Sequence, residues 1–378
     1  MSKLYKLKED KEYITSSKIT NFLNPEYSCI LLNRFDNLDN IKSVIKNKII
    51  EKDNKDSYSS ISGDVIGLVN VNMDNVSNRA LFIKNDFKEE RVVYSAKKKL
   101  DKESLLDLFR GTKYYKLLSK VGVSNIIVNC ICDELYVRNN DFLIKNYRDD
   151  VIDTLDDLVS ILNIDSGIFT FKNSDANNIT SFASDIGSYV KLNISVLEDT
   201  YLIGRGYYLL RSLKIKKENA IIFTLKEILE IASLIKYNYF RSEMYVSVVD
   251  TINKKIRVCN VKKNILVSEL LSKLKIDKED YCYIKNGLYT GKKINYNKEI
   301  IDEGFESLFI VDRSFFKEDK CINCGKCVSV CEMKINPKKM KELGLVDERC
   351  INCGLCSYFC PSNRKLNLIC EVKDEENN

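Results

Sequence analysis

The chain has 378 residues, which is too long for one ordinary hydrophobic core, so about two to four domains are expected. It contains no histidine, which excludes a histidine general base, a catalytic triad with histidine, and histidine ligation of haem or a Rieske cluster. The net charge is only +6 and the lysines are interspersed with acidic residues, so nucleic-acid binding is disfavoured.

No stretch of the sequence resembles a membrane span or a secretory signal. The first residues, MSKLYKLKEDKEY, have no apolar core, and the apolar segment 219–236 is interrupted by Lys226, Glu227 and Glu230. We therefore expect a soluble, cytoplasmic protein, and peripheral association with the inner face of a membrane complex stays open. A reducing compartment also suits the 14 cysteines as free thiols and cluster ligands.

The first region, residues 1–98, is predicted to be a small β domain. Strand-like segments at 29–32 and 65–71 are separated by polar turns, and no long amphipathic helix interrupts them.

Residues 99–242 alternate helical and strand patterns. A helix is predicted at 151–162, and another follows Thr224, which forms a capping box with Glu227. Strands are predicted at 125–132, 168–172 and 190–197. This alternation predicts an α/β domain with a largely parallel sheet. Cys130 and Cys132 fall at the end of the first strand, where they are either two buried apolar side chains or a redox or metal site.

Residues 243–312 predict a β-grasp module. Segments 244–250 and 255–261 have the pattern of a hairpin, and a helix at 266–276 follows. Short strands with turns at Asn286-Gly287 and Thr290-Gly291 complete a strand–strand–helix–strand order.

Residues 313–378 carry two cysteine runs with one spacing, C-x2-C-x2-C-x3-C, which is typical of a protein with two [4Fe–4S] clusters. In this pattern three thiolates of a run hold one cluster and the fourth reaches the other cluster. We assign one cluster to Cys321, Cys324, Cys327 and Cys360, and the other to Cys350, Cys353, Cys356 and Cys331. No catalytic side chain is predicted.

Zinc and disulfides are the alternatives. Zinc sites usually pair two separated C-x2-C motifs, and a disulfide framework needs a secreted chain. Glu332 stands where the first run would usually have proline, but that proline donates no ligand. From Arg313 to Cys370 there are 11 basic and six acidic side chains, an excess that offsets the negative charge of two clusters.

With this order of regions the chain resembles the RnfC family, a component of the Rnf electron-transport complex. The cysteine runs CINCGKCVSVCEMKINPKKM and CINCGLCSYFCPSN carry the resemblance most strongly. SISGDV at 60–65 is similar to a turn of that family's barrel-sandwich domain, and NCICDELY at 129–136 is similar to its N-x-x-E-C-E-P-Y. The resemblance implies a multidomain α+β fold with an N-terminal barrel-sandwich domain (1–98), a Rossmann-like FMN/NADH-type domain (99–242), a soluble-ligand-binding β-grasp domain (243–312) and a ferredoxin-like domain (313–378).

The flavin and nicotinamide pocket that the resemblance implies is degenerate here. The glycine-rich loop G-G-A-G-F-P-T is matched by RGTKYY at 110–115, which keeps only Gly111. The element Y-x-x-G-E-E-x-A-L is matched by 201–209, where Gly204 is kept and the acidic pair has become Arg205 and Gly206. In NCICDELY the second acid, Glu134, is kept, whereas Cys132 replaces the first. We expect FMN and NADH binding to be lost, the alternative being a remodelled pocket.

Three functions follow from this reading. The leading one is an iron–sulfur electron-transfer protein that passes single electrons between redox partners on other chains. The second is an FMN-containing NADH or ferredoxin oxidoreductase subunit, like RnfC or the cobalamin reductases. The third is an assembly scaffold, which would not need intact cysteine runs. A relative with a similar domain order is the electron-transfer protein associated with proline reductase, which would make a reductase the acceptor.

Overall fold

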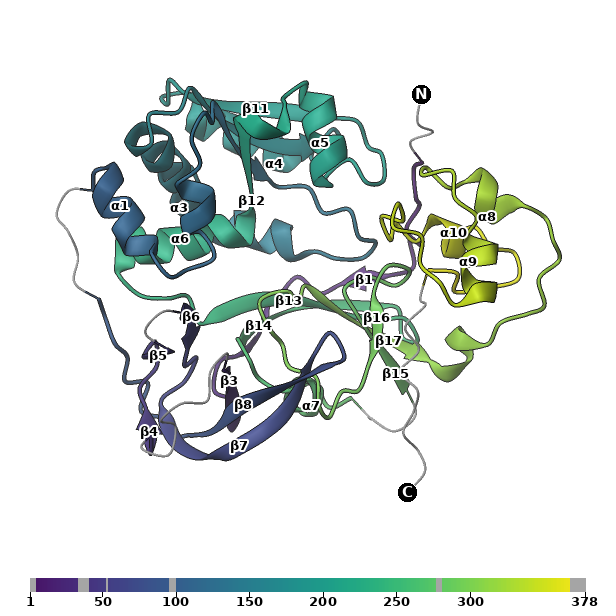
Figure 1. Ribbon diagram of the computed structural model, residues 1–378, viewed down its shortest axis with the longest axis horizontal. Helices are drawn as coiled ribbons and strands as arrows, with labels where there is room; N and C mark the ends of the chain where they lie inside the picture. Colours follow the sequence, from purple (N-terminus) through teal and green to yellow (C-terminus); the bar gives the residue numbers. More distant parts are fainter. Residues whose placement is uncertain (1–4, 33–40, 52–53, 95–99, 277–280, 368–378) are drawn as a thin grey trace.

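The computed structural model describes residues 5–32, 41–51, 54–94, 100–276 and 281–367, and has a mixed α/β, multidomain architecture. An α/β layer lies above a large mixed sheet, a β region lies below it, and a small helical lobe lies to one side (Figure 1). Within the described residues, no helix is both long and apolar enough to cross a membrane.

The N-terminal region is built from short strands. The predicted strands at 29–32 and 65–71 are present as β3 and β7 in an antiparallel sheet of order β3-β8-β7-β4, and a separate pair is formed by β5 and β6. Two earlier strands, β1 and β2, run parallel to β14 and so join the large sheet of residues 243–312. The strands are β1 (Ile14–Thr15), β2 (Thr20–Phe22), β3 (Tyr27–Leu31), β4 (Ser43–Val44), β5 (Ile49–Glu51), β6 (Asn54–Tyr58), β7 (Gly63–Met73) and β8 (Val76–Asn85).

The predicted parallel sheet of the α/β region is confirmed. Its four strands have the order β11-β10-β9-β12, and every neighbouring pair is parallel. The strands are β9 (Asn125–Asn129), β10 (Ser166–Lys172), β11 (Leu192–Leu197) and β12 (Ala220–Thr224). The strand order therefore reverses at β9, so the switch point, where ligands bind in open parallel sheets, lies beyond the carboxyl ends of the neighbouring strands β9 and β12.

Helices flank this sheet on both faces. They are α1 (Lys102–Phe109), α2 (Tyr115–Leu118), α3 (Asn139–Ile161), α4 (Ala176–Ile186), α5 (Gly206–Leu213) and α6 (Leu225–Tyr237), with the 3-10 turn η2 (Lys217–Asn219) before β12. The capping box of Thr224 and Glu227 begins α6 as predicted. The predicted helix 151–162 is the second half of α3, which begins at Asn139. The first half was not predicted, because a kink at Tyr147 interrupts the apolar periodicity.

The large sheet begins with the predicted hairpin of β13 (Glu243–Asp250) and β14 (Lys255–Lys262). The helix that follows, α7 (Val267–Lys273), is shorter than the predicted 266–276. The remaining strands are β15 (Tyr281–Lys285), β16 (Lys292–Ile294) and β17 (Ser307–Asp312), in the order β1-β14-β13-β17-β15-β16. The chain passes from β14 through α7 to β15, and β17 then enters the sheet between β13 and β15, parallel to β13 and antiparallel to β15.

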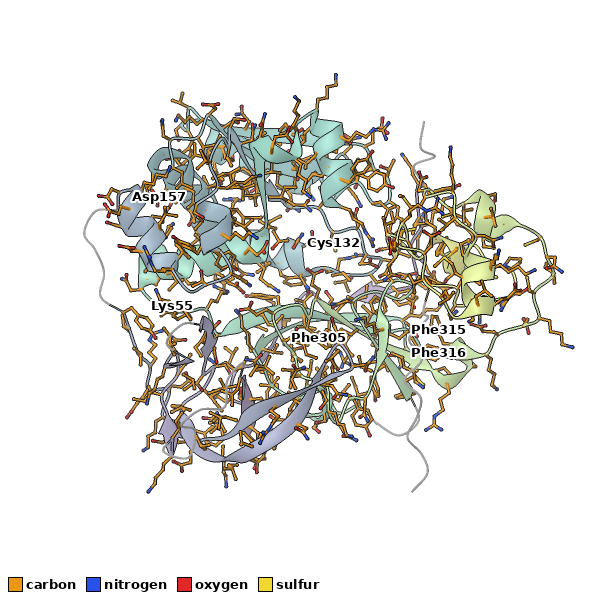
Figure 2. All side chains as sticks on the ribbon, in the orientation of Figure 1. Lys55, Cys132, Asp157, Phe305, Phe315 and Phe316 are labelled. Atoms are coloured by element: carbon orange, nitrogen blue, oxygen red, sulfur yellow. The ribbon has the colours of Figure 1, made fainter. Side chains whose placement is uncertain are left out.

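The helical lobe follows β17. It contains the 3-10 turn η3 (Arg313–Phe316) and three short helices, α8 (Lys326–Ser329), α9 (Pro337–Leu343) and α10 (Leu355–Tyr358). Phe315 and Phe316 lie at the junction with the large sheet (Figure 2). The Lys365 ammonium lies 3.8 Å from the ring centroid of Phe315, so a cation–π contact ties the end of the lobe to its beginning.

A buried ion network joins the α/β layer to the sheet below it. Lys263, directly after β14, donates to Glu230 of α6 at 2.8 Å, to Glu303 at 2.8 Å and to the Tyr58 hydroxyl at 2.9 Å. Burial opposes ionisation of Glu230, but Lys263 and Lys113 outweigh it and lower the pKa of this carboxyl. The network therefore connects the β region, the α/β layer and the large sheet at one point.

We expect Lys263→Met to destabilise the protein by about 3–5 kcal/mol, because removing one member of a buried ion pair leaves the others buried and uncompensated. Circular dichroism during thermal unfolding would show a lower midpoint. Lys254→Met is the control, since Lys254 pairs with Asp10 and Glu12 at the surface and should leave the midpoint essentially unchanged. Equal midpoints for the two variants would contradict a stabilising role for the network.

Candidate iron–sulfur centres

The two cysteine runs have the same backbone conformation. In each, the asparagine and the glycine of C-I-N-C-G are left-handed: φ is 56° at Asn323 and 71° at Gly325, and 47° at Asn352 and 73° at Gly354. Glycine adopts this conformation without steric cost, and asparagine tolerates it better than most residues. Each glycine is followed at once by a four-residue helix, α8 or α10. The repeated spacing thus produces two equivalent loops.

Each predicted set of four cysteines lines one cavity, and each cavity takes its fourth cysteine from the other run. The first cavity is lined by Cys321, Cys324, Cys327 and Cys360. The second cavity is lined by Cys350, Cys353, Cys356 and Cys331. Within the described part of the chain, no three Cys, Asp or Glu side chains converge closely enough to hold a single metal ion. Four thiols around an otherwise largely apolar cavity fit the donor set of a [4Fe–4S] cluster.

The two cavities differ in exposure and electrostatics. Cys324 of the first cavity is exposed, and the backbone N–H of Asn323 lowers the pKa of Cys321, whereas burial raises the pKa of Cys327. In the second cavity burial raises the pKa of Cys353, and it raises the pKa of Cys356 to about 12. The second cavity is therefore the more deeply enclosed of the two.

The α/β region provides the cover over the second cavity. Tyr201, Leu202 and Tyr208 pack with Val330 and Leu355 in one apolar cluster. The Tyr201 hydroxyl donates to the Cys353 carbonyl at 2.8 Å, and Arg205 donates to the Ile351 carbonyl at 2.8 Å. These contacts come from the segment 201–209, in which the sequence resemblance indicates a changed nicotinamide site.

Two further cavities lie at the carboxyl edge of the parallel sheet. One, of about 390 Å³, lies beyond β9, β10 and β11 and is lined by Cys132, Glu134, Lys172 and Asp199 among others. The other, of about 230 Å³, lies at the switch point between Asn129 at the end of β9 and Thr224 at the end of β12. Its lining includes Cys132 and Phe305, which come from opposite sides of the gap between the α/β layer and the large sheet (Figure 2).

The residues predicted to mark the degenerate flavin pocket do not all meet. Glu134 and Gly204 both line the switch-point cavity, whereas Gly111 lines neither of the two carboxyl-edge cavities. Burial raises the pKa of Glu134 to about 7, although Thr290 and Arg205 both favour its ionised form. Cys130 is buried, and burial raises the pKa of both Cys130 and Cys132.

Sequence reasoning missed the contacts between the cysteine loops and the rest of the chain. Asn352 donates to the Thr290 carbonyl at 2.7 Å, and the side-chain amide of Asn367 contacts the Tyr289 carbonyl. Gly354 lies so close to the connection between β15 and β16 that a Cβ on it would lie 2.8 Å from the Tyr289 carbonyl oxygen. The turn signal at Thr290-Gly291 marked the loop but gave no indication of its partner.

Comparison with known proteins identifies the lobe. Residues 314–368 match a family model described as a 4Fe-4S dicluster domain, so the C-terminal lobe is an iron–sulfur electron-transfer domain. A search of curated proteins found no match.

Among solved structures the chain is similar to an NAD+-reducing [NiFe]-hydrogenase in its H2-reduced and air-oxidised states. The identities are 11% and 8% and the TM-scores 0.47 and 0.48. In each case the alignment covers 71% of this chain, and it spans only 59% and 60% of the hydrogenase chain.

The crossed arrangement predicts crossed effects of substitution. Cys331→Ser should impair the cluster at Cys350, Cys353 and Cys356, and Cys360→Ser should impair the cluster of the first run, because each removes the fourth thiol of the opposite cavity. Electron paramagnetic resonance of the reduced protein would show which cluster is impaired, and iron analysis would show how much iron is lost. Cys282→Ser, a free thiol on β15, is the control and should change neither signal. The crossed assignment is wrong if each serine affects only the cluster of its own run.

Proposed function

We propose that this chain is an iron–sulfur electron-transfer protein of the RnfC-like family. It passes single electrons between partner redox proteins through two [4Fe–4S] clusters. The observation that carries the proposal is the pair of four-cysteine cavities, each completed by a thiol from the other run, within the region that matches a dicluster domain.

The ligands we assign are those predicted from the spacing. Cys321, Cys324, Cys327 and Cys360 hold one cluster, and Cys350, Cys353, Cys356 and Cys331 hold the other. A bound [4Fe–4S] cluster supplies one-electron redox chemistry at a potential set by its charge, hydrogen bonding and exposure to solvent. The chain's own task is to hold both clusters in one lobe and to present one of them to a partner.

The first cavity is the side at which a partner binds. Its lining contains the exposed side chains of Ile322 and Val328, together with Lys338 and Arg364, and no acidic side chain. The second cavity is covered by Tyr201 and its neighbours. A donor or acceptor can therefore approach the first cluster more closely than the second, and electron transfer is faster over a shorter distance.

Several contacts support the loss of flavin and NADH binding. In the loop that resembles the family's glycine-rich element, Tyr114 is buried against Glu230, and Lys113 forms ion pairs with Glu230 and Glu303. Arg205, in place of the acid of the nicotinamide element, is engaged with the second cysteine loop. A flavin phosphate needs free backbone N–H groups and glycines that allow close approach, and this loop offers Gly111 alone.

The finer domain assignments belong to the same proposal. The order of β13, β14, α7 and β17, with β17 parallel to β13, supports a soluble-ligand-binding β-grasp domain at 243–312. The 3-2-1-4 order of the parallel sheet supports a Rossmann-like domain at 99–242. We retain a barrel-sandwich domain at 1–98 and a cytoplasmic location, where thiols stay reduced.

The second candidate is an FMN-containing NADH or ferredoxin oxidoreductase subunit. The observation that favours it is the switch-point cavity of about 230 Å³, which lies where open parallel sheets bind ligands and retains Glu134 and Gly204. A small-molecule ligand in that cavity would return the chain to the reductase class.

Anaerobic purification should yield about eight iron atoms per chain and a broad absorbance that bleaches with dithionite. After incubation with FMN and gel filtration, no stoichiometric flavin should remain, and NADH alone should not bleach the clusters. Flavin absorbance and an NADH titration under argon measure both. Iron without flavin supports the electron-transfer protein, whereas bound flavin or bleaching by NADH supports the reductase; stoichiometric zinc in place of iron contradicts both.

A further inference from the structure

A single side chain of the α/β region connects the second cysteine loop to a buried carboxylate. Arg205, directly before α5, donates through Nη1 to the Ile351 carbonyl at 2.8 Å. Its Nη2 lies 3.4 Å from Oε1 of Glu134. The Arg205 side chain is 30% exposed and the Glu134 side chain 21%, so both are largely shielded from water. Arginine stays charged at any ordinary pH, so this cation is permanent.

The loop that Arg205 contacts is fixed from several sides. Tyr201 donates to the carbonyl of Cys353, two residues beyond Ile351. Asn352, between them, donates to the Thr290 carbonyl of the large sheet. The backbone of the second run is therefore held by hydrogen bonds from two separate regions of the fold. The first run, within the described residues, packs against the α/β region through Val330 but forms no hydrogen bond to it.

Acidic side chains lie on the α/β side of the Arg205 guanidinium, and the cysteine loop lies on its other side. Toward the α/β region lie Glu134 and Asp133, the latter paired with Lys172 at 3.1 Å. Toward the lobe, Arg205 faces the loop that carries Cys350 and Cys353 and donates to the Ile351 carbonyl between them. A reduced cluster gains one negative charge, which a nearby fixed cation stabilises in a site of low dielectric.

We propose that Arg205 is a positioning and tuning residue for the second cluster, and that it raises the reduction potential of that cluster alone. Glu134 partly opposes this effect because it brings an anion to the same guanidinium. The α/β region thus acts on the clusters through a side chain that stands where the resemblance would place an acid for nicotinamide. This inference rests on the proposed function, because it requires clusters at the two cysteine sets.

The test is a redox titration of both clusters at pH 8, where Glu134, with a pKa of about 7, is ionised. Cluster signals are resolved by electron paramagnetic resonance and assigned with the Cys331→Ser and Cys360→Ser variants. Arg205→Met should lower the reduced-to-oxidised ratio of the second cluster about three- to tenfold at fixed potential, where tenfold is about 59 mV for one electron. The first cluster should change by less than about twofold.

Two further variants separate charge from packing. Arg205→Lys keeps the cation and should restore most of the ratio, and Glu134→Gln removes the opposing anion and should shift the second cluster in the opposite direction. Loss of packing alone would not reverse sign. Arg211→Met is the matched control, since Arg211 lies exposed on the same helix α5 and should leave both potentials unchanged.

Each outcome decides the proposal. If Arg205→Met keeps its iron and shifts neither cluster, or shifts both equally, the tuning role is wrong. If Arg205→Met loses its second cluster, the direction of the Glu134→Gln shift decides. A wild-type protein without iron would instead overturn the proposed function, which iron analysis shows before any titration begins.

Discussion

The structure of the lobe depends on the exchange of the fourth cysteine between the two runs. Neither run can complete a four-thiol site alone, because Cys331 lines the cavity of the second run and Cys360 that of the first. Helix α9 lies between the two sites: Pro337 and Met340 line one cavity, and Asn336 and Lys338 line the other. In the proposed function a cluster at either site would therefore constrain both runs, and the lobe should fold as one unit when both are bound.

The unequal environments of the two cavities follow from how the lobe docks. The second cavity is pressed against Tyr201, Leu202 and Tyr208, and burial raises the pKa of its thiols Cys353 and Cys356. An apolar cover alone would disfavour the charge of a cluster, since burying an uncompensated charge is costly. Arg205 brings a permanent cation to the same interface, and backbone carbonyls of the loop accept its hydrogen bond. Burial and charge compensation are thus supplied by the same short segment.

Local signals in the sequence predicted the parts of this fold that depend on neighbours in the chain. The Thr224–Glu227 capping box and the hairpin of β13 and β14 were predictable because both follow from short-range hydrogen bonding and alternation. The first half of α3 was not, because the kink at Tyr147 breaks its apolar period. Strands β1 and β2 were missed for another reason: they have two and three residues and are formed only by pairing with β14, more than 200 residues away.

For the site, too, local patterns could be predicted from the sequence and long-range contacts could not. The spacing of the cysteines predicts which thiols share a cavity, because a [4Fe–4S] cluster needs its ligands at characteristic separations along the chain. Such spacing can be read directly from a sequence. The contacts of Tyr201 and Arg205 with the second run join residues about 150 positions apart, through backbone carbonyls that carry no sequence signal. Arg205 could be recognised from the sequence only as a departure from a family pattern, which suggests loss of a function. Its hydrogen bond to the Ile351 carbonyl and its ion pair with Glu134 show that Arg205 also has a structural role, because it connects the second cysteine loop to the α/β region. In the proposed function the α/β region binds no nucleotide, but it still covers the second cysteine set and brings the charge of Arg205 to it.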